Sequence, residues 1–194
     1  MTQGITLIIG LGNPGTEYAQ TRHNAGFRFL DTLLAGNPGA LRSESRFCAR
    51  VGRVEVEPRE LWLLAPATFM NYSGEAVAKF ARYYKVPAQE ILVVHDDLDL
   101  PPGTVRLKLG GGDGGHHGVH DIALRLGTGD FVRLRIGIGR PPAGQEATSY
   151  VLRKAPAAEQ ELIDAAIHNA HVHLGDIVRG RYQRAMNLLH AHKS

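Results

Sequence analysis

A glycine-rich stretch, G-L-G-N-P-G-T-E-Y-A-Q-T-R-H-N-A-G, runs from Gly10 to Gly26. It follows the apolar run Ile5 to Ile9, which predicts a short buried strand. Glycine and proline after a strand let the backbone turn sharply and approach a ligand closely. Near the end of the stretch, His23 lies where the pattern predicts the start of a helix. Because loops at strand ends carry the functional groups of α/β proteins, we expect the active site here.

The rest of the chain alternates between strand patterns and helix patterns. This alternation predicts a single α/β domain over residues 1–194, a sandwich of helices around a central, partly parallel sheet. The hairpin-like run 42–65 indicates that the sheet is mixed. The expected strands are 5–9, 46–57 (or a hairpin turning at Gly52-Arg53), 61–64, 91–95, 104–109 and 131–138; the expected helices are 25–34 (ended by Gly36 to Gly39), 73–84, a short one ending near Leu126, 156–178 and 182–190.

Composition and charge narrow the class of protein. Hydrophobic residues make up 43% of the chain and charged residues 21%, which is ordinary for a soluble globular protein. We find neither a signal-peptide pattern nor an apolar run of membrane-spanning length, and the single cysteine, Cys48, fits a reducing compartment. We therefore expect a cytoplasmic protein without a membrane partner.

The net charge of +3 is unevenly placed along the chain. The first hundred residues are nearly neutral, and the basic excess lies in residues 101–154 and 176–194. Such an excess is typical of a protein that binds a polyanion, but it is equally typical of a solvated arginine-rich surface. Both interpretations stay open on charge alone.

Gly10, Gly12 and Gly15 formally match the dinucleotide-binding pattern G-x-G-x-x-G. That pattern needs a helix to start at once, and here Pro14 and a polar run intervene. It also needs an acidic residue at the tip of the next strand about 20 positions on, and Asp31 falls inside a predicted helix instead. The spacing therefore argues against a nicotinamide cofactor.

His23 is the candidate catalytic residue of the opening stretch. The structural alternative is a histidine that caps a helix start. A histidine with a pKa near neutrality is the usual general base for activating water, and it needs an orienting partner that is commonly a carboxylate. Asp96, at the end of the apolar run 91–95, is placed to supply it, with Asp97 and Asp99 as alternatives.

Asn13 and Asn71 lie on two separate loops at predicted strand ends. Each asparagine could close a turn, but as a pair they could hold a peptide-like amide, since an amide side chain both donates and accepts. Phe69 and Met70 would then give an apolar wall beside them or belong to the core.

Histidines and aspartates between residues 95 and 121 raise the alternative of a metal site. His116 and His120 are four residues apart and could share one helix face. No H-E-x-x-H pattern or paired cysteine spacing supports a metal, and Gly118 weakens the helix between them. We therefore expect no metal.

The loop from Gly110 to Gly115 contains only one residue other than glycine, Asp113. Exposed backbone N–H groups next to a helix start can bind phosphate. The loop lacks the Lys-Ser/Thr pair of a nucleotide-triphosphate site, which argues against nucleotide-triphosphate chemistry and leaves a nucleic-acid phosphate open. Four cations flank the loop in sequence and would add positive charge: Lys108, Arg133, Arg135 and Arg140.

Five motifs in order resemble those of bacterial peptidyl-tRNA hydrolases: G-L-G-N-P-G-x-x-Y-x-x-T-R-H-N-A-G from Gly10, P-x-T-F-M-N-x-S-G from Pro66, H-D-x-L-D-L-P-P-G from His95, K-L-G-G-G-x-G-G-H from Lys108 and R-L-R-I-G-I-G-R-P from Arg133. The resemblance covers about residues 6–153, and the helices after it are similar to the family's C-terminal ones. It implies a single-domain α/β/α sandwich with a mixed, twisted sheet, monomeric and without a metal or other cofactor. It also implies hydrolysis of the ester between peptide and tRNA.

The resemblance implies roles for individual residues. His23 would be the general base for water and Asp96 its orienting carboxylate. Asn13, Tyr18, Met70 and Asn71 would hold the peptide and the 3′ end of the tRNA, while Lys108 and Arg135 would contact phosphates of the acceptor arm. A donor for the developing oxyanion is expected at Asn71.

The chain departs from the family pattern at three positions: Asp97 replaces a glutamate, Asp113 a histidine, and His117 an asparagine of the substrate crevice. An imidazole cannot donate and accept at one atom, so His117 would change one amide-type contact. A protein of another class, which binds RNA with this fold and does not hydrolyse it, is the competing hypothesis. The intact His23 and Asp96 favour the enzyme.

Overall fold

The computed structural model describes residues 3–35, 40–56 and 58–191. Within these ranges a seven-stranded sheet forms the centre of the molecule, in the order β2-β3-β4-β1-β5-β7-β6. The strands are β1 (Leu7–Gly10), β2 (Arg42–Glu44), β3 (Ala49–Val56), β4 (Arg59–Pro66), β5 (Ile91–Asp97), β6 (Val105–Leu109) and β7 (Val132–Gly137).

The sheet is mixed, as predicted. Strands β4, β1, β5 and β7 run parallel to one another, with Ile8 paired to Leu63 on one side and to Leu92 on the other. Strands β2 and β3 on one flank and β6 on the other are antiparallel to their neighbours. The central strand is apolar throughout because both of its faces are covered, which is the usual pattern for parallel strands.

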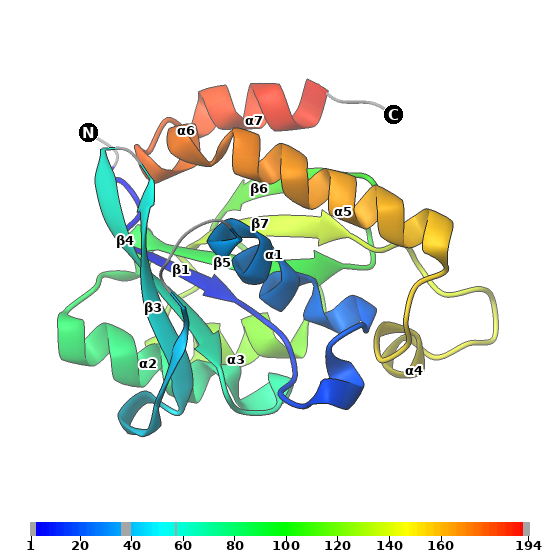
Figure 1. Ribbon diagram of the computed structural model, residues 1–194, viewed down its shortest axis with the longest axis horizontal. Coiled ribbons are helices and arrows are strands. Elements are labelled where there is room, and N and C mark those ends of the chain that lie inside the picture. The colour runs from blue at the N-terminus through cyan, green and yellow to red at the C-terminus, as the bar shows by residue number, and fades with distance from the viewer. Residues whose placement is uncertain (1–2, 36–39, 57, 192–194) are drawn as a thin grey trace.

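Helices cover both faces of the sheet (Figure 1). Side chains on a strand point alternately to its two faces, so Ile8 packs into one core and Leu7 and Ile9 into the other. The α/β/α sandwich is therefore confirmed. One core includes residues of α1 (Ala25–Leu34), α4 (Ala147–Val151), α5 (Ala157–Val172), α6 (Leu174–Val178) and α7 (Tyr182–Ala191); the other includes residues of α2 (Ser73–Tyr84) and α3 (His117–Leu126).

One open alternative is decided, and one expected boundary was wrong. Of the two possibilities for 46–57, the structure has a strand rather than a hairpin turning at Gly52-Arg53, because both residues pair with β4. The predicted helix 156–178 is two helices that break at His173, where the backbone leaves the helical conformation (φ −101°, ψ 6°). The expected helix end at Gly36 to Gly39 lies outside the described residues.

The topology brings distant polar segments to one edge of the sheet. Asn13 follows β1, Met70 follows β4, and Asp96 lies near the end of β5; these three strands are parallel, so the segments meet at their carboxyl ends. None of the helices in the described ranges is long and apolar enough to cross a membrane.

Candidate active site

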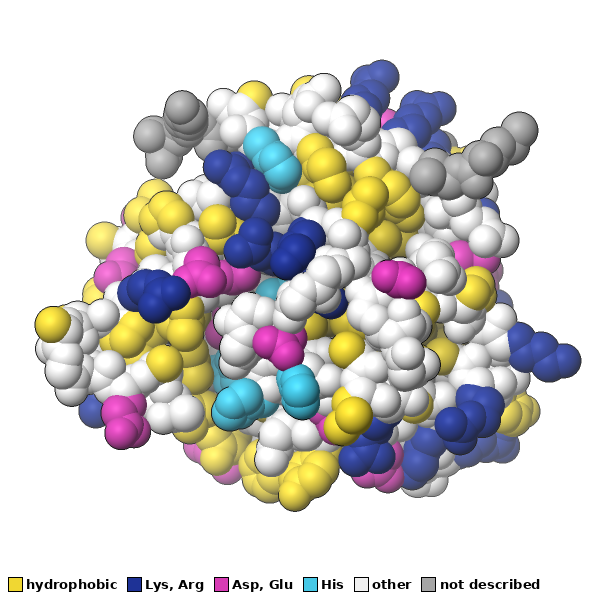
Figure 2. Space-filling model, turned by 180° about the vertical axis from the view of Figure 1, so that it is seen from behind, with side chains coloured by type: hydrophobic (Ala, Val, Ile, Leu, Met, Phe, Trp, Pro, Cys, Tyr) yellow, Lys and Arg dark blue, Asp and Glu magenta, His cyan; other side chains and the backbone are white. Residues whose placement is uncertain are grey.

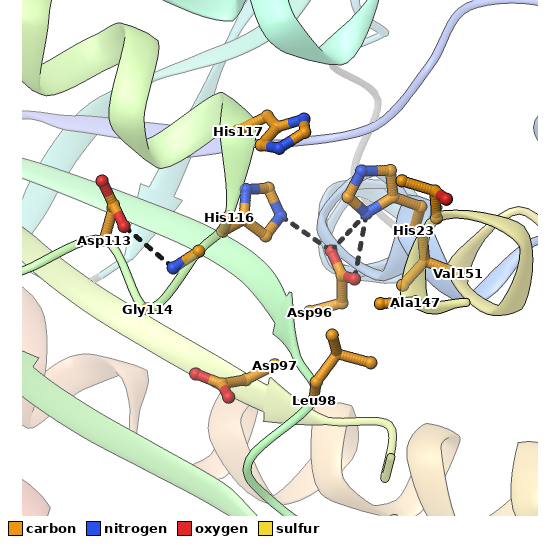
Figure 3. A pocket seen from close by; sticks show the side chains of 12 residues that line it. His23, Asp96, Asp97, Leu98, Asp113, Gly114, His116, His117, Ala147 and Val151 are labelled. Carbon is orange, nitrogen blue, oxygen red and sulfur yellow. Dashed lines mark hydrogen bonds and ion pairs between the residues drawn. The ribbon is translucent and has the colours of Figure 1, made fainter. Parts of the chain in front are cut away.

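His23 and Asp96 meet at this edge of the sheet (Figure 3). His23 belongs to a 3-10 turn, Arg22–Asn24, just before α1, and its Nδ1 lies 3.0 and 2.9 Å from the two carboxylate oxygens of Asp96. A carboxylate accepts, so Nδ1 carries the proton and Nε2 keeps its lone pair. His23 therefore has the tautomer that a general base requires.

His116 donates to the same carboxylate through its other ring nitrogen. Its Nε2 lies 2.9 Å from Asp96 Oδ1. Its Nδ1 accepts from the backbone N–H groups of Gly118 (3.2 Å) and Val119 (3.3 Å), so the ring caps the N-terminus of α3. The tautomer of His116 is therefore the opposite of that of His23, and neither of its nitrogens is free.

His95 is a third imidazole at this place, and it is fully enclosed. Its Nδ1 donates to the backbone oxygen of Asp96 at 2.7 Å, and its ring centroid lies 4.8 Å from that of His116. Its Nε2 has no hydrogen-bond partner among the described residues. Burial, with a smaller effect of His116, lowers the pKa of His95 to about 3, so this ring stays neutral at physiological pH.

The electrostatics favour a charged Asp96 beside a readily protonated His23. Burial of the His23 ring opposes its protonation, but the charge and hydrogen bond of Asp96 outweigh burial and raise the pKa of His23 above 6.5. Burial likewise opposes ionisation of Asp96, which is 2% exposed, yet the two histidines hold its pKa well below the usual range. The pair is built to stabilise an imidazolium ion.

The tautomers bear on the metal alternative. Among the described residues, His23, Asp96 and His116 are the one group whose ligand atoms could surround a cation, since they lie within 4.8 Å of one another. To bind a cation, Nε2 of His116 would have to lose its proton, and a neutral ring would then carry that proton on Nδ1. Nδ1 already accepts from two backbone N–H groups, so a proton there would face two other donors. The donor set fits a proton network rather than a metal. His120 binds Asp113 instead (2.8 Å), away from this group.

A cavity of about 260 Å³ opens on one side of His23. Every crevice residue predicted from the sequence lines this cavity: Asn13, Tyr18, Met70, Asn71 and His117. Phe69 lines it as well. Phe69 is 56% exposed and meets Tyr18 edge to face, with ring centroids 6.3 Å apart. The wall beside the two amides is therefore aromatic and open to a ligand.

Asn13 is fixed by bonds that leave part of its side-chain amide free. Its Oδ1 accepts from the backbone N–H of Met70 at 2.7 Å. Its own backbone donates to Asn24 Oδ1 (2.8 Å) and accepts from Asn24 Nδ2 (3.0 Å). These bonds hold Asn13 in place and leave its Nδ2 donor and the second lone pair of Oδ1 for a ligand.

A second cavity, of about 140 Å³, lies on the other side of His23 and is lined by Asp96, Asp97, Leu98 and the end of the glycine-rich loop. Four residues line both cavities: His23, His117, Thr148 and Val151. His23 therefore stands at the junction of two spaces. The sequence patterns did not indicate the part played by α4, whose Thr148 and Val151 form the wall opposite His117.

The predicted basic residues lie beyond the second cavity. Arg135 on β7 binds Asp97 (Nε to Oδ2, 2.7 Å), Lys108 on β6 reaches the backbone oxygen of Gly112 (3.4 Å), and Arg106 is the register partner of Arg135. On the face seen in Figure 2, Lys and Arg side chains gather beside histidine and acidic side chains. Asp97 thus pairs with Arg135 and is not the orienting carboxylate, while Asp99 binds the exposed Arg140.

Arg133 lies at the glycine-rich loop, as its place in the sequence suggests, but it is buried and does not join the exposed cations. It is 2% exposed and donates to the backbone oxygens of Gly111 (2.6 Å), Gly112 and Gly129 (3.3 Å). It therefore holds the glycine-rich loop along β7. Four glycines of this loop have positive φ, which non-glycine residues adopt only rarely: Gly110, Gly111, Gly114 and Gly115.

The predicted phosphate cradle is not present at this loop. The helix start that would offer N–H groups is already capped by His116. The backbone N–H of Gly115 donates to Asp113 Oδ1 at 2.8 Å, so a carboxylate also lies where an anion would have to bind. The loop instead carries the His116 ring to Asp96.

Comparison with known proteins gives one consistent result. Residues 7–194 match the family model for peptidyl-tRNA hydrolase. A peptidyl-tRNA hydrolase from Neisseria gonorrhoeae (strain NCCP11945) is 47% identical over 191 residues, 98% of this chain and 100% of the relative. One from Methylococcus capsulatus is 51% identical over 187 residues, 96% and 99%. The crystal structure of peptidyl-tRNA hydrolase from Acinetobacter baumannii superposes with a TM-score of 0.94 at 44% identity, covering 100% of this chain and 98% of that one.

Proposed function

The chain belongs to the peptidyl-tRNA hydrolase family of enzymes, and from that premise we propose that it cleaves the ester of peptidyl-tRNA with His23 as general base and Asp96 as its orienting carboxylate. The observation that carries these roles is the 2.9 Å contact between His23 Nδ1 and Asp96, which leaves Nε2 unprotonated at the junction of the two cavities.

The chemistry needs water and one base. His23 Nε2 takes a proton from water as the water oxygen attacks the ester carbonyl, and Asp96 stabilises the imidazolium ion that forms. Collapse of the tetrahedral intermediate breaks the bond to the ribose oxygen. The imidazolium then returns its proton to that oxygen, which releases the peptide acid and the free tRNA hydroxyl.

The residues on the two sides of His23 indicate which part of the substrate lies in each cavity. The cavity with Asn13 and Asn71 is uncharged and has an aromatic wall, which suits the peptide. The other cavity leads toward Lys108 and Arg135, which suits the phosphates of the tRNA acceptor arm. The free amide donor of Asn13 can bind a peptide oxygen, and Asn71 remains the candidate donor for the oxyanion.

We also propose that residues 1–194 act as one domain and as a monomer. The residues proposed for catalysis and for substrate binding surround His23 within one chain. The single cysteine is free, which suits the cytoplasm.

The test compares N-acetyl-aminoacyl-tRNA with the unacetylated tRNA, in the presence of EDTA. Rapid release from the acetylated substrate alone is expected. His23→Ala should lower kcat by about 10²–10⁴-fold and keep tRNA affinity, while the exposed His168→Ala should behave as wild type. Binding of tRNA without release would favour the non-catalytic RNA-binding protein, and activity that needs an added divalent ion would favour a metal site.

A further inference from the structure

Arg22 precedes His23 in the 3-10 turn, yet its partners lie 128 or more positions away in the chain. The two cavities that meet at His23 are called the reaction channel below. We propose that Arg22 is a positioning residue, which holds the α4 wall of this channel against the turn that carries His23. The proposal rests on the hydrolysis proposed above and adds a determinant of substrate binding to it.

The guanidinium of Arg22 binds the end of α4 and the segment just after it. One terminal nitrogen donates to the backbone oxygens of Tyr150 (3.2 Å), Arg153 (3.4 Å) and Lys154 (3.5 Å). The other binds Glu159 Oε2 at 3.3 Å. The group lies 3.9 Å from the centroid of the Tyr150 ring, and the side chain is 6% exposed.

The backbone reinforces this contact. The N–H of Arg22 donates to the oxygen of Arg153 at 3.1 Å, and Thr21 forms an isolated antiparallel bridge with Lys154. The turn with the general base and the segment after α4 are therefore joined directly. A shift of one relative to the other changes the distance between His23 and the α4 wall beside it.

Helix α4 has five residues and little of its own to fix it. A helix this short is marginal without tertiary contacts. Its other anchor is Tyr150, whose hydroxyl donates to the backbone oxygen of Ile138 at 2.8 Å. Thr148 and Val151 line both cavities beside His23. The grip of Arg22 thus sets the width of the channel at the junction where the ester must lie.

Lysine cannot replace this grip. The planar guanidinium stacks on the ring and offers several N–H groups in a fixed fork, whereas an ammonium is a compact charge that cannot do both. Arg22→Lys keeps the positive charge next to His23 and removes the fork. This variant should therefore show the effect of a displaced α4 wall without a change in the positive charge next to His23.

The matched control is Arg28→Lys. Arg28 also links the N-terminal part of the chain to α5, through Asp164 (3.5 Å), and binds Gln20 (2.9 Å), but neither of these bonds reaches α4. Arg22→Lys should raise KM for N-acetyl-aminoacyl-tRNA on the order of tenfold with kcat nearly unchanged, as expected for a loss of uniform binding. Arg28→Lys should change neither constant.

Two further readouts separate positioning from general damage. The N-acetyl-aminoacyl ester of adenosine should lose the same factor with Arg22→Lys, because this fragment occupies the channel and reaches no basic strand. The pH profile of kcat should not shift, since Asp96 is untouched. Tyr150→Phe, a mild change that removes only the other anchor of α4, should raise KM in the same direction.

An unchanged KM in folded Arg22→Lys, with or without a lower melting temperature, would overturn the proposal for Arg22. The proposed hydrolysis would still stand if His23→Ala lost activity. An unchanged KM in Tyr150→Phe would likewise count against a channel wall at α4. A wild-type protein without hydrolysis would overturn both proposals together.

Discussion

His23 and His116 donate to the same carboxylate, Asp96, through different ring nitrogens: Nδ1 of His23 and Nε2 of His116. Their ring centroids lie 5.0 Å apart. The remaining nitrogen of His116 accepts two backbone N–H groups, whereas Nε2 of His23 has no hydrogen-bond partner among the described residues. A proton taken from water therefore has a single destination in this network.

Hydrolysis should rise with pH through the pKa of His23. The base must be neutral to take a proton, and the net influence of Asp96 holds the pKa of His23 above 6.5. The acid limb of kcat/KM should therefore have its midpoint above pH 6.5. A midpoint below that value would show that burial, not Asp96, dominates the ring. NMR titration of the His23 ring checks the assignment.

Asp96→Asn should remove the base by reversing the tautomer of His23. The N–H of His116 is fixed and needs an acceptor, so the new amide oxygen turns toward His116 and the amide NH₂ toward His23 Nδ1. His23 must then accept at Nδ1 and carry its proton on Nε2. We expect kcat to fall about 10²–10⁴-fold.

Nitrogen NMR of the imidazole should show Nδ1–H in the wild type and Nε2–H in Asp96→Asn. Asp99→Asn is the matched control, because Asp99 lies on the same segment and pairs with the exposed Arg140. A wild-type spectrum with the proton on Nε2 would contradict the arrangement.

His116→Ala and His116→Asn should have different effects on stability. Alanine removes the N-cap of α3, which costs about 0.5–2 kcal/mol, whereas asparagine is a preferred N-cap. Both lose the contact with Asp96, because the asparagine side chain is too short to span it. Urea unfolding should thus show a destabilised His116→Ala and a His116→Asn nearer wild type, while both lose hydrolysis. Equal stability of the two variants would count against the cap.

His95 should make the protein less stable in acid. The folded state keeps this ring neutral down to its pKa of about 3, whereas the unfolded chain protonates it near 6.5. The unfolded state then binds one more proton, so the free energy of unfolding falls with pH below 6.5, by about 1.4 kcal/mol per unit from this group.

His95→Asn should reduce that slope by about one proton, since the amide can still donate to the backbone of Asp96. Urea unfolding at several pH values measures it. The same change at His168, which is exposed on α5, should leave the slope as in the wild type. A slope unaltered in His95→Asn would mean that the buried ring takes up a proton without unfolding.

Lys108→Ala and Arg135→Ala should weaken tRNA binding through lost phosphate contacts. Each variant should raise KM with kcat unchanged and reduce the slope of log affinity against log salt by about one. Arg53→Ala is the control, because Arg53 lies on β3 at the other flank of the sheet and pairs with Glu60. A salt slope equal to wild type in both variants would remove these residues from the interface.

The sequence was sufficient for the sheet, its mixed character and the location of the site. Alternating and continuous apolar runs reveal which strands are covered, and five ordered motifs identify the family. The predicted crevice residues do share one cavity with His23. The sequence left open whether the chain turns at Gly52, and the pairing of Gly52 with Leu63 in the folded sheet keeps it in a strand.

The sequence alone could not assign protons or partners. His23 and Asp96 are 73 positions apart, and the choice among Asp96, Asp97 and Asp99 depends on which carboxylate the fold brings to Nδ1. Arg133 and Arg135 look alike in an alternating strand, yet one is buried under the glycine loop and the other pairs at the surface. Local pattern determines which residues face the core, whereas tautomers, buried cations and the α4 wall depend on contacts between distant segments that only the packed chain creates.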